Sequence, residues 1–236
     1  MTVAIAWEGV RLVVFDLDGT LYDQPPLRLA MARELGLHCL RGRSTQTLRT
    51  LRHFRQVREK LGEGSGSADF ATEQYRLTAQ LCDRPEREVR ALVEEWMERR
   101  PLPHLPRYKA RGIDRLFAAI RASGRTIAVW SDFPVTAKLR ALGLAADHAI
   151  WAGDEGIGRL KPDPSGLRAL MERSGATPHQ TLVIGDRMDR DVRAATAAGT
   201  RALLRSRRPH ARAASFRHYD DPVFAPVLRD ALRGVG

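Results

Sequence analysis

Cysteine is scarce in this 236-residue sequence, and the two present, Cys39 and Cys82, lie far apart, outside any CxxC motif or paired histidine spacing. This excludes a disulfide framework and predicts two reduced thiols packed on helices. No stretch approaches the roughly 18 consecutive apolar residues of a membrane-spanning helix. Residues 1–10 also lack a basic residue followed by a long apolar run. We therefore expect a soluble, cytoplasmic protein without a membrane partner.

Lysine is equally scarce, with four residues, so arginine carries nearly all of the net charge of +11. A basic surface concentrates anionic ligands, and both phosphorylated metabolites and nucleic acids are anionic. Two segments are especially basic: residues 41–60 have seven basic residues against one acid, and residues 205–217 have five arginines and no acid. Only His53 and Phe54 interleave the first segment, and no recognised nucleic-acid module is present. This pattern favours a solvated or substrate-facing surface over a nucleic-acid partner.

Short apolar runs alternate with helical patterns over most of the chain. The runs cover residues 10–17, 126–131, 149–152, 181–184 and 201–204, and helical stretches cover residues 113–122, 135–142, 164–174 and 189–198. This alternation predicts right-handed βαβ crossovers and therefore an α/β fold with a doubly wound parallel sheet. In such sheets ligands bind beyond the carboxyl ends of the strands.

The strand pattern disappears after the first strand, between residues 23 and 106. Apolar residues follow helical spacing over 48–61 and again over 89–97. Asp83 is the predicted N-cap of the second helix, and the Gly/Ser-rich residues 62–67 break the helical pattern. The chain length suits a core domain with a smaller insertion. We expect an α/β core of residues 1–22 and 107–236 and an all-helical domain of residues 23–106.

The strongest chemical signal is the segment Asp16-Leu17-Asp18-Gly19-Thr20 after the first apolar run. Carboxylates at positions i and i+2 leave a strand end on the same side, and Gly19 permits the turn that follows. One carboxylate is then a candidate nucleophile and the other a candidate proton donor and acceptor for the same reacting centre. The alternative is an acidic turn without function.

Further polar residues follow the other predicted strands. Asp186, Asp189 and Asp191 come after the run 181–184, and crowded acids of this kind predict a divalent cation such as Mg²⁺. Asp189 is more simply an N-cap of the next helix. Ser131 ends the second run, and Lys161 lies between prolines ahead of a helix, so both are candidates for binding a phosphate group.

These four motifs, in this order, resemble the haloacid dehalogenase (HAD) superfamily of aspartate-nucleophile phosphohydrolases. The resemblance covers residues 10 to about 204 and implies a Rossmann-like core with an α-helical cap. It implies that Asp16 attacks phosphorus and that Asp18 protonates the leaving alcohol and then activates water. It also implies that Ser131 and Lys161 hold the phosphoryl oxygens.

The same resemblance implies a Mg²⁺ site made by Asp16, Asp186 and the backbone carbonyl of Asp18, with Asp191 orienting these ligands. One departure is Asp132, which stands in the phosphate pocket where relatives often have Asn. A carboxylate there repels phosphate unless it is paired with an arginine or turned away.

The expected function is therefore Mg²⁺-dependent hydrolysis of a small phosphomonoester through an aspartyl-phosphate. The resemblance disfavours dehalogenation, because dehalogenases of this superfamily have no acid at the position of Asp18. A phosphomutase uses the same core, differing in how the cap excludes water, and stays open as an alternative. The rival from another class is an anion-binding or nucleic-acid-binding protein with a vestigial site. The substrate and the oligomeric state stay open.

Overall fold

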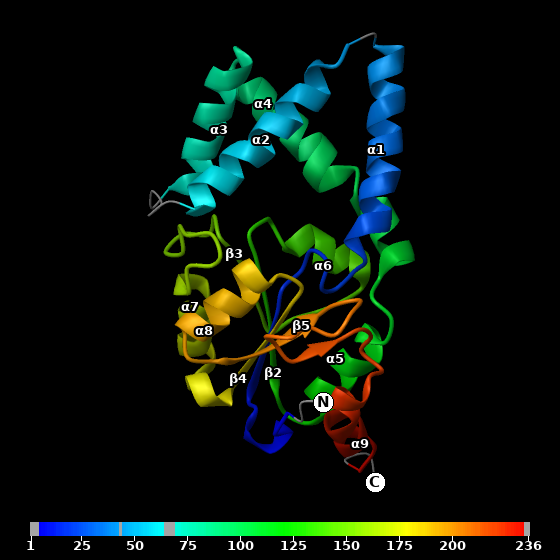
Figure 1. The fold of residues 1–236 in the computed structure, drawn as a ribbon, viewed down its shortest axis with the longest axis vertical. Coiled ribbons are helices and arrows are strands. Elements are labelled where there is room, and N and C mark those ends of the chain that lie inside the picture. Colours follow the sequence, from blue (N-terminus) through cyan, green and yellow to red (C-terminus); the bar gives the residue numbers. More distant parts are fainter. Residues whose placement is uncertain (1–4, 43, 64–68, 234–236) are drawn as a thin grey trace.

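The structure, a computed structural model, describes residues 5–42, 44–63 and 69–233 (Figure 1). Among these residues, six strands form one parallel sheet in the order β3-β2-β1-β4-β5-β6. The strands are β1 (Leu12–Phe15), β2 (Thr126–Ser131), β3 (His148–Trp151), β4 (Thr181–Gly185), β5 (Arg201–Arg205) and β6 (Ser215–Phe216). The five predicted strands are confirmed with shorter bounds at β1, and β6 is an addition that the sequence pattern did not indicate.

Helices cover both faces of the sheet, which confirms the doubly wound α/β fold. Side chains alternate along β1: Val13 and Phe15 join one buried cluster, and Leu12 and Val14 join the other. Helices α5 (Ile113–Ala122), α6 (Thr136–Leu142) and α9 (Ala225–Arg233) supply the first cluster, and α7 (Ser165–Ser174) and α8 (Arg193–Ala197) supply the second. Because both faces are covered, β1 and the interiors of its neighbours β2 and β4 are apolar throughout rather than alternating.

The connection from β1 to β2 carries α1 (Gln24–Arg41), α2 (Gln46–Glu63), α3 (Phe70–Cys82) and α4 (Glu86–Val93). A π-helical turn (Glu94–Arg99) and a 3-10 helix (Leu102–Tyr108) lead back to the sheet. Helices α1–α4 stand beyond one end of the sheet (Figure 1). They have a core of their own, formed by Leu51, Phe54, Val89, Val93 and Trp96. The domain boundaries at residues 23 and 106 stay a prediction.

Two capping predictions are wrong. Asp83 ends α3 in the left-handed conformation (φ 48°), a region that Asp tolerates better than most residues, and Pro85 holds the N-cap position of α4. Asp189 is not an N-cap either, because Arg187 holds that position and Asp189 lies in the following turn. Its carboxylate binds the Arg187 guanidinium instead, at 2.7 Å.

The structure also bears on the predicted helix break, the two cysteines and the expected lack of a membrane-spanning helix. Gly62 and residue 63 belong to α2, so that part of the predicted break is helical, and residues 64–67 lie outside the described residues. Cys39 and Cys82 are both free and half-buried. Among the described helices, none is long and apolar enough to cross a membrane.

Candidate active site

The predicted site residues meet where β1 ends, next to both of its neighbours in the sheet. Phe15 pairs with Val129 of β2 on one side and with Ile184 of β4 on the other. Asp16 follows directly, and its backbone N–H donates to the carbonyl of Ile184 at 2.8 Å. The chain winds from β1 through β2 to β3 and then returns to β4, so this is the switch point at which such sheets bind ligands.

Lys161 is a buried cation between two of the predicted acids. Its Nζ lies 2.6 Å from Asp16 Oδ1 and 2.8 Å from Asp191 Oδ1, and the residue is only 2% exposed. Burial opposes its charge, but Asp16 and Asp191 outweigh burial and hold the pKa of Lys161 above its ordinary value. Lys161 is therefore a fixed positive charge at the end of β1.

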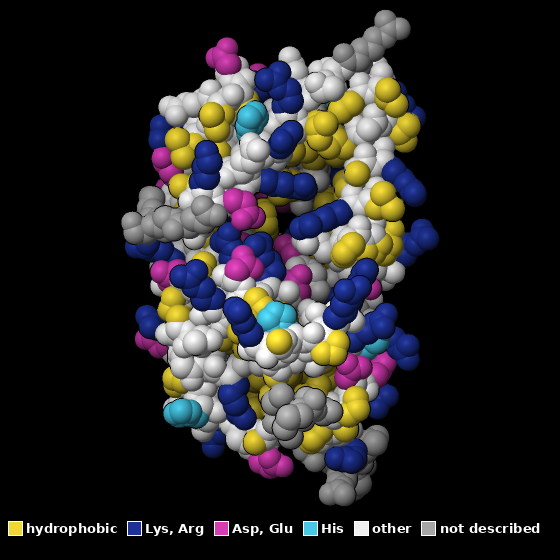
Figure 2. All heavy atoms as spheres, viewed as in Figure 1, with side chains coloured by type: hydrophobic (Ala, Val, Ile, Leu, Met, Phe, Trp, Pro, Cys, Tyr) yellow, Lys and Arg dark blue, Asp and Glu magenta, His cyan; other side chains and the backbone are white. Residues whose placement is uncertain are grey.

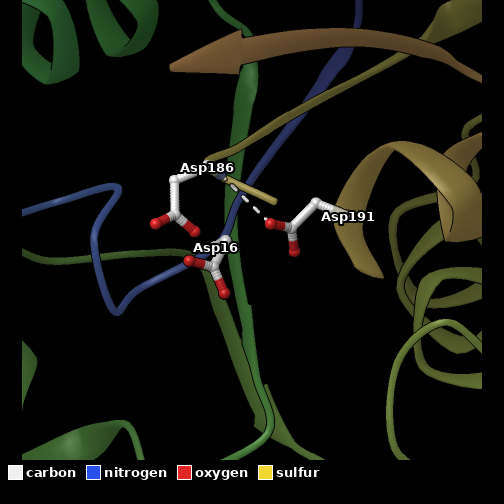
Figure 3. A group of neighbouring side chains, drawn as sticks. All are labelled: Asp16, Asp186 and Asp191. Atoms are coloured by element: carbon white, nitrogen blue, oxygen red, sulfur yellow. Dashed lines mark hydrogen bonds between the residues drawn. The ribbon is translucent and has the colours of Figure 1, made fainter. Parts of the chain in front are cut away.

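Asp16, Asp186 and Asp191 form a group in which one carboxylate oxygen of each lies within 4.8 Å of the others (Figure 3). Asp191 Oδ2 is occupied, because it accepts the backbone N–H groups of Asp186 at 3.1 Å and Arg187 at 3.0 Å. Asp16 Oδ2 is buried without a hydrogen-bond partner among the described residues. The Asp186 carboxylate likewise has no hydrogen bond or ion pair within that part of the chain.

Negative charge is in surplus in this group. Burial, with Asp191 beside it, raises the pKa of Asp186 to about 7. Burial raises the pKa of Asp16 as well, with Lys161 opposing this rise and the two other acids adding to it. A bound divalent cation would offset this surplus and favour the ionised carboxylates. Carboxylate oxygens are also the ligands that Mg²⁺ prefers, so the donor set fits Mg²⁺.

Gly19 allows the chain to pass close to Asp186. Its φ of +96° is one that L side chains rarely adopt, and a methyl group here would overlap the Asp186 carboxylate. The glycine after the second aspartate is therefore required by the close approach of two loops.

The Asp18 carboxylate is held apart from this group of three acids. Its Oδ1 accepts from Lys138 Nζ at 2.6 Å and from the Tyr22 hydroxyl. Burial works against its charge, but Lys138 and these hydrogen bonds outweigh it, and the pKa of Asp18 lies below its ordinary value. Sequence reasoning missed both partners, although Lys138 is one of only four lysines.

Ser131 and Asp132 lie at the end of β2. Ser131 is buried, and its Oγ accepts the backbone N–H of Phe133 at 3.1 Å. Asp132 Oδ1 accepts the backbone N–H of Lys161 at 3.0 Å, and its backbone carbonyl accepts from Arg58. The Asp132 carboxylate thus joins the Lys161 loop to β2 rather than lying free. Burial raises its pKa.

Helix α2 reaches this site through two arginine contacts that sequence reasoning missed. Arg58 of α2 donates to Asp132 as described, and Arg190, which precedes Asp191, donates to the backbone carbonyl of Lys161. The same Arg190 guanidinium binds Glu59 of α2, with Nη2 to Oε2 at 3.1 Å. Figure 2 shows a hollow between the helical segment and the sheet, surrounded by basic and acidic side chains.

Comparison with known proteins identifies the family. The profile of the haloacid dehalogenase-like hydrolases matches residues 10–199. The chain belongs to this family. A phosphoglycolate phosphatase from Shigella boydii is 32% identical over 216 residues, which cover 82% of this chain and 80% of that protein. The predicted family is confirmed, and so is the enzyme class of this HAD-like hydrolase, a phosphoric monoester hydrolase.

Solved structures of other HAD proteins share the fold. A 2-haloacid dehalogenase from Pseudomonas syringae superposes with a TM-score of 0.61 at 20% identity, covering 96% of this chain and all of that one. A HAD hydrolase from Bacillus subtilis bound to magnesium has a TM-score of 0.60 at 17% identity, covering 89% and 95%. At these identities the likeness concerns the fold alone.

Proposed function

We propose that this HAD-like hydrolase removes the phosphate group from a small phosphomonoester with the help of Mg²⁺, through an aspartyl-phosphate on Asp16. The observation that carries the proposal is the position of Asp16, which lies beside Lys161 and Asp186 at the switch point with Oδ2 free of hydrogen bonds. Because a similar protein is named a phosphoglycolate phosphatase, phosphoglycolate is the first substrate to test.

In the proposed reaction a carboxylate oxygen of Asp16 forms a bond to phosphorus while the bond to the leaving oxygen breaks. Asp18 gives its proton to that oxygen, and the alcohol departs. Asp18 then takes a proton from water, whose oxygen attacks phosphorus and releases Asp16. Lys161 and Ser131 bind the phosphoryl oxygens, and Asp132 keeps the Lys161 loop against β2.

The residues proposed to hold Mg²⁺ are Asp16, Asp186 and the backbone carbonyl of Asp18, with Asp191 orienting the loop through its two backbone contacts. When bound, the ion offsets negative charge shared by the acids and the phosphate. The helical segment is proposed to act as a cap over the site.

Asp18 needs a proton before it can act as an acid. Its lowered pKa and its contact with Lys138 mean that it is ionised in the substrate-free protein. That state suits the second half of the reaction, in which Asp18 is a base. The first half requires the Asp18–Lys138 pair to open so that Asp18 takes up a proton.

The test is phosphate release from a panel of phosphorylated metabolites that includes phosphoglycolate. Thorough metal removal with EDTA should abolish release and Mg²⁺ should restore it. Asp16→Asn should neither turn over nor form a phosphoenzyme, whereas Asp189→Asn, which changes an exposed acid in the segment after β4 that also carries Asp186, should retain activity. Metal-independent turnover would contradict the Mg²⁺ assignment, and an isomerised ester in place of free phosphate would identify a mutase.

A further inference from the structure

Arg58 of α2 is half-buried at the junction with the sheet domain, and its guanidinium Nε is fully enclosed. Its side chain lies over the ring of Phe133, 3.8 Å from the centroid, with the rings of Phe54 and Phe70 at 5.7 and 5.5 Å. These rings fix its orientation without neutralising its charge. One N–H donates to the carbonyl of Asp132, the residue after Ser131.

This half-buried cation has no carboxylate partner in the described part of the chain. It forms no ion pair there, and its Nε has no hydrogen-bond partner. The carboxylates of Asp132, Asp18 and Glu98 act on it only through space. Burial lowers the pKa of Arg58 to about 10, as expected for a desolvated charge without a counter-ion. An anion at this position would supply the counter-ion that the protein does not.

Two more arginines, Arg55 on α2 and Arg28 on α1, have no ion pair among the described residues. Arg55 is three residues before Arg58, so the two share one side of α2. Burial lowers the pKa of Arg55, and the charge of Arg28 on α1 lowers it further, which places these two guanidinium groups close together. Arg28 also acts on Tyr22, where it opposes the rise in pKa that burial and Asp18 cause.

We propose that Arg58, supported by Arg28 and Arg55, binds a second acidic group of the substrate, so that the substrate is a short phosphomonoester carrying another anionic group. The inference rests on the proposed function and names its substrate class. Asp132 links the residues proposed to bind the two ends of such a substrate. Its backbone carbonyl accepts a hydrogen bond from Arg58, and its carboxylate accepts one from the backbone N–H of Lys161. A phosphate bound at Asp16 and an acid bound at Arg58 can therefore belong to one small molecule.

The test compares two esters that differ only at the second group: phosphoglycolate, with a carboxylate, and 2-hydroxyethyl phosphate, with a neutral hydroxymethyl group. The bisphosphate of ethanediol replaces the carboxylate with a phosphate and shows which anion is preferred. For the wild type, kcat/KM should favour the acidic esters. In Arg58→Met this preference should fall by about 10- to 100-fold, the usual effect of a charge-assisted hydrogen bond.

Arg55→Met is the second variant, because the partial burial that lowers the pKa of Arg55 leaves much of its side chain exposed, and its loss should not disturb folding. It should reduce the same preference by a smaller factor. Arg49→Met is the matched control: nine residues from Arg58 on the same helix correspond to about two and a half turns, so Arg49 faces the opposite side. It should leave the preference unchanged.

Binding is measured separately from turnover, by titrating the two monoesters into Asp16→Asn protein with Mg²⁺ present. Tighter binding of phosphoglycolate that depends on Arg58 supports the inference even if hydrolysis is never detected, in which case the proposed function alone fails. Equal treatment of the acidic and neutral esters by the wild type overturns the inference. So does an unchanged preference in both Arg58→Met and Arg55→Met.

Discussion

Asp16 and Asp18 are two residues apart, yet their surroundings shift their pKa values in opposite directions. Asp16 is buried beside two other acids, and its pKa is raised although Lys161 is bound to it. Asp18 is buried beside Lys138 and Tyr22, and its pKa is lowered. In the metal-free protein Lys161 does not offset the effects of burial and the two other acids on Asp16, the proposed nucleophile, whereas Lys138 and Tyr22 do offset burial for Asp18, the proposed acid/base.

Substitution of Asp18 separates the two halves of the proposed reaction. Asp18→Asn should slow hydrolysis of an alkyl phosphate by roughly 10² to 10⁴, because proton transfer to the leaving group is lost. With p-nitrophenyl phosphate, whose leaving group needs little protonation, the first half should recover and the phosphoenzyme should accumulate. Rapid-quench mass analysis should find the phosphoryl group on the peptide that holds Asp16. A phosphoryl group on Ser131 or a histidine would contradict the mechanism.

Gly19 provides a second test at this scale. Gly19→Ala should displace the Asp186 carboxylate and raise the Mg²⁺ concentration needed for half-maximal activity, besides costing about 1–3 kcal/mol of stability through backbone strain. Gly124→Ala is the control, because Gly124 also has a positive φ (+71°) but a methyl group there meets no atom within 4 Å. If both variants have the same Mg²⁺ requirement, the loop contact does not shape the metal site.

Among the elements, the helical segment between β1 and β2 has its own core and touches the sheet domain through polar contacts as well. The Phe54 side chain is buried in that core and packs on Tyr75, whereas Phe70 of α3 packs with Ala152 and Leu160 of the sheet domain. The ion pair of Glu59 with Arg190 joins α2 to the loop that carries Asp191. Because most of the buried side chains of the segment lie in its own core, and only a small cluster around Phe70 joins it to the sheet domain, we expect the segment to open without unfolding the sheet.

Truncation of this core tests the domain boundaries at residues 23 and 106. Phe54→Ala should cost about 3–5 kcal/mol locally, and hydrogen exchange measured by mass spectrometry should rise mainly within residues 23–106. Val13→Ala, in the buried strand β1, is the counterpart and should raise exchange in the sheet. Uniform exchange over the whole chain in Phe54→Ala would show that the helices are not a separate unit.

For the whole molecule, the surplus of acids at the site links stability to pH and metal. Asp186 has a pKa of about 7 in the folded protein against an ordinary value of 3.8. Between these values the folded state keeps a proton that the unfolded state has lost, so this group makes stability fall as pH rises through the window. Above about pH 7 both states are ionised and the full penalty is present, unless a cation offsets it.

Thermal melting measures this linkage. In EDTA, the melting temperature of the wild type relative to Asp186→Asn should fall between pH 5 and pH 8. Mg²⁺ at 100 times its Kd should then add about 2.7 kcal/mol, or about 5–10 °C for a chain of this size. The increase should be larger at pH 8 than at pH 5. An equal increase at both pH values, or one retained in Asp186→Asn, would contradict the metal site.

The net charge of +11 also acts on the whole molecule. Attraction of small anionic esters to a basic surface should weaken with salt, because the Debye length is about 8 Å at physiological ionic strength. Nucleic-acid binding would instead give tight retention that falls linearly with the logarithm of salt concentration. Filter binding of DNA and RNA at low salt distinguishes the two, and we expect no retention.

The sequence alone determined five of the six described strands, the order of the motifs and the acids at the strand ends. Apolar runs such as 181–184 and the segment beginning at Asp16 are local patterns, and parallel strands bring their carboxyl ends to one edge by geometry. Capping was less predictable at Asp83, where a left-handed helix end overrode the cap pattern. The sequence around Asp83 fits both the start of one helix and the end of another, and in the structure Asp83 ends α3.

Only the tertiary structure decided which side chains face one another across the site. Lys138 is 120 residues from Asp18, and Arg58 is 74 residues from Asp132, so no periodic pattern relates either pair. Whether an arginine on α2 is solvated or buried without a counter-ion depends on how that helix lies on the sheet. The charges that tune Asp18, and those proposed to choose the substrate, are therefore consequences of packing between distant segments.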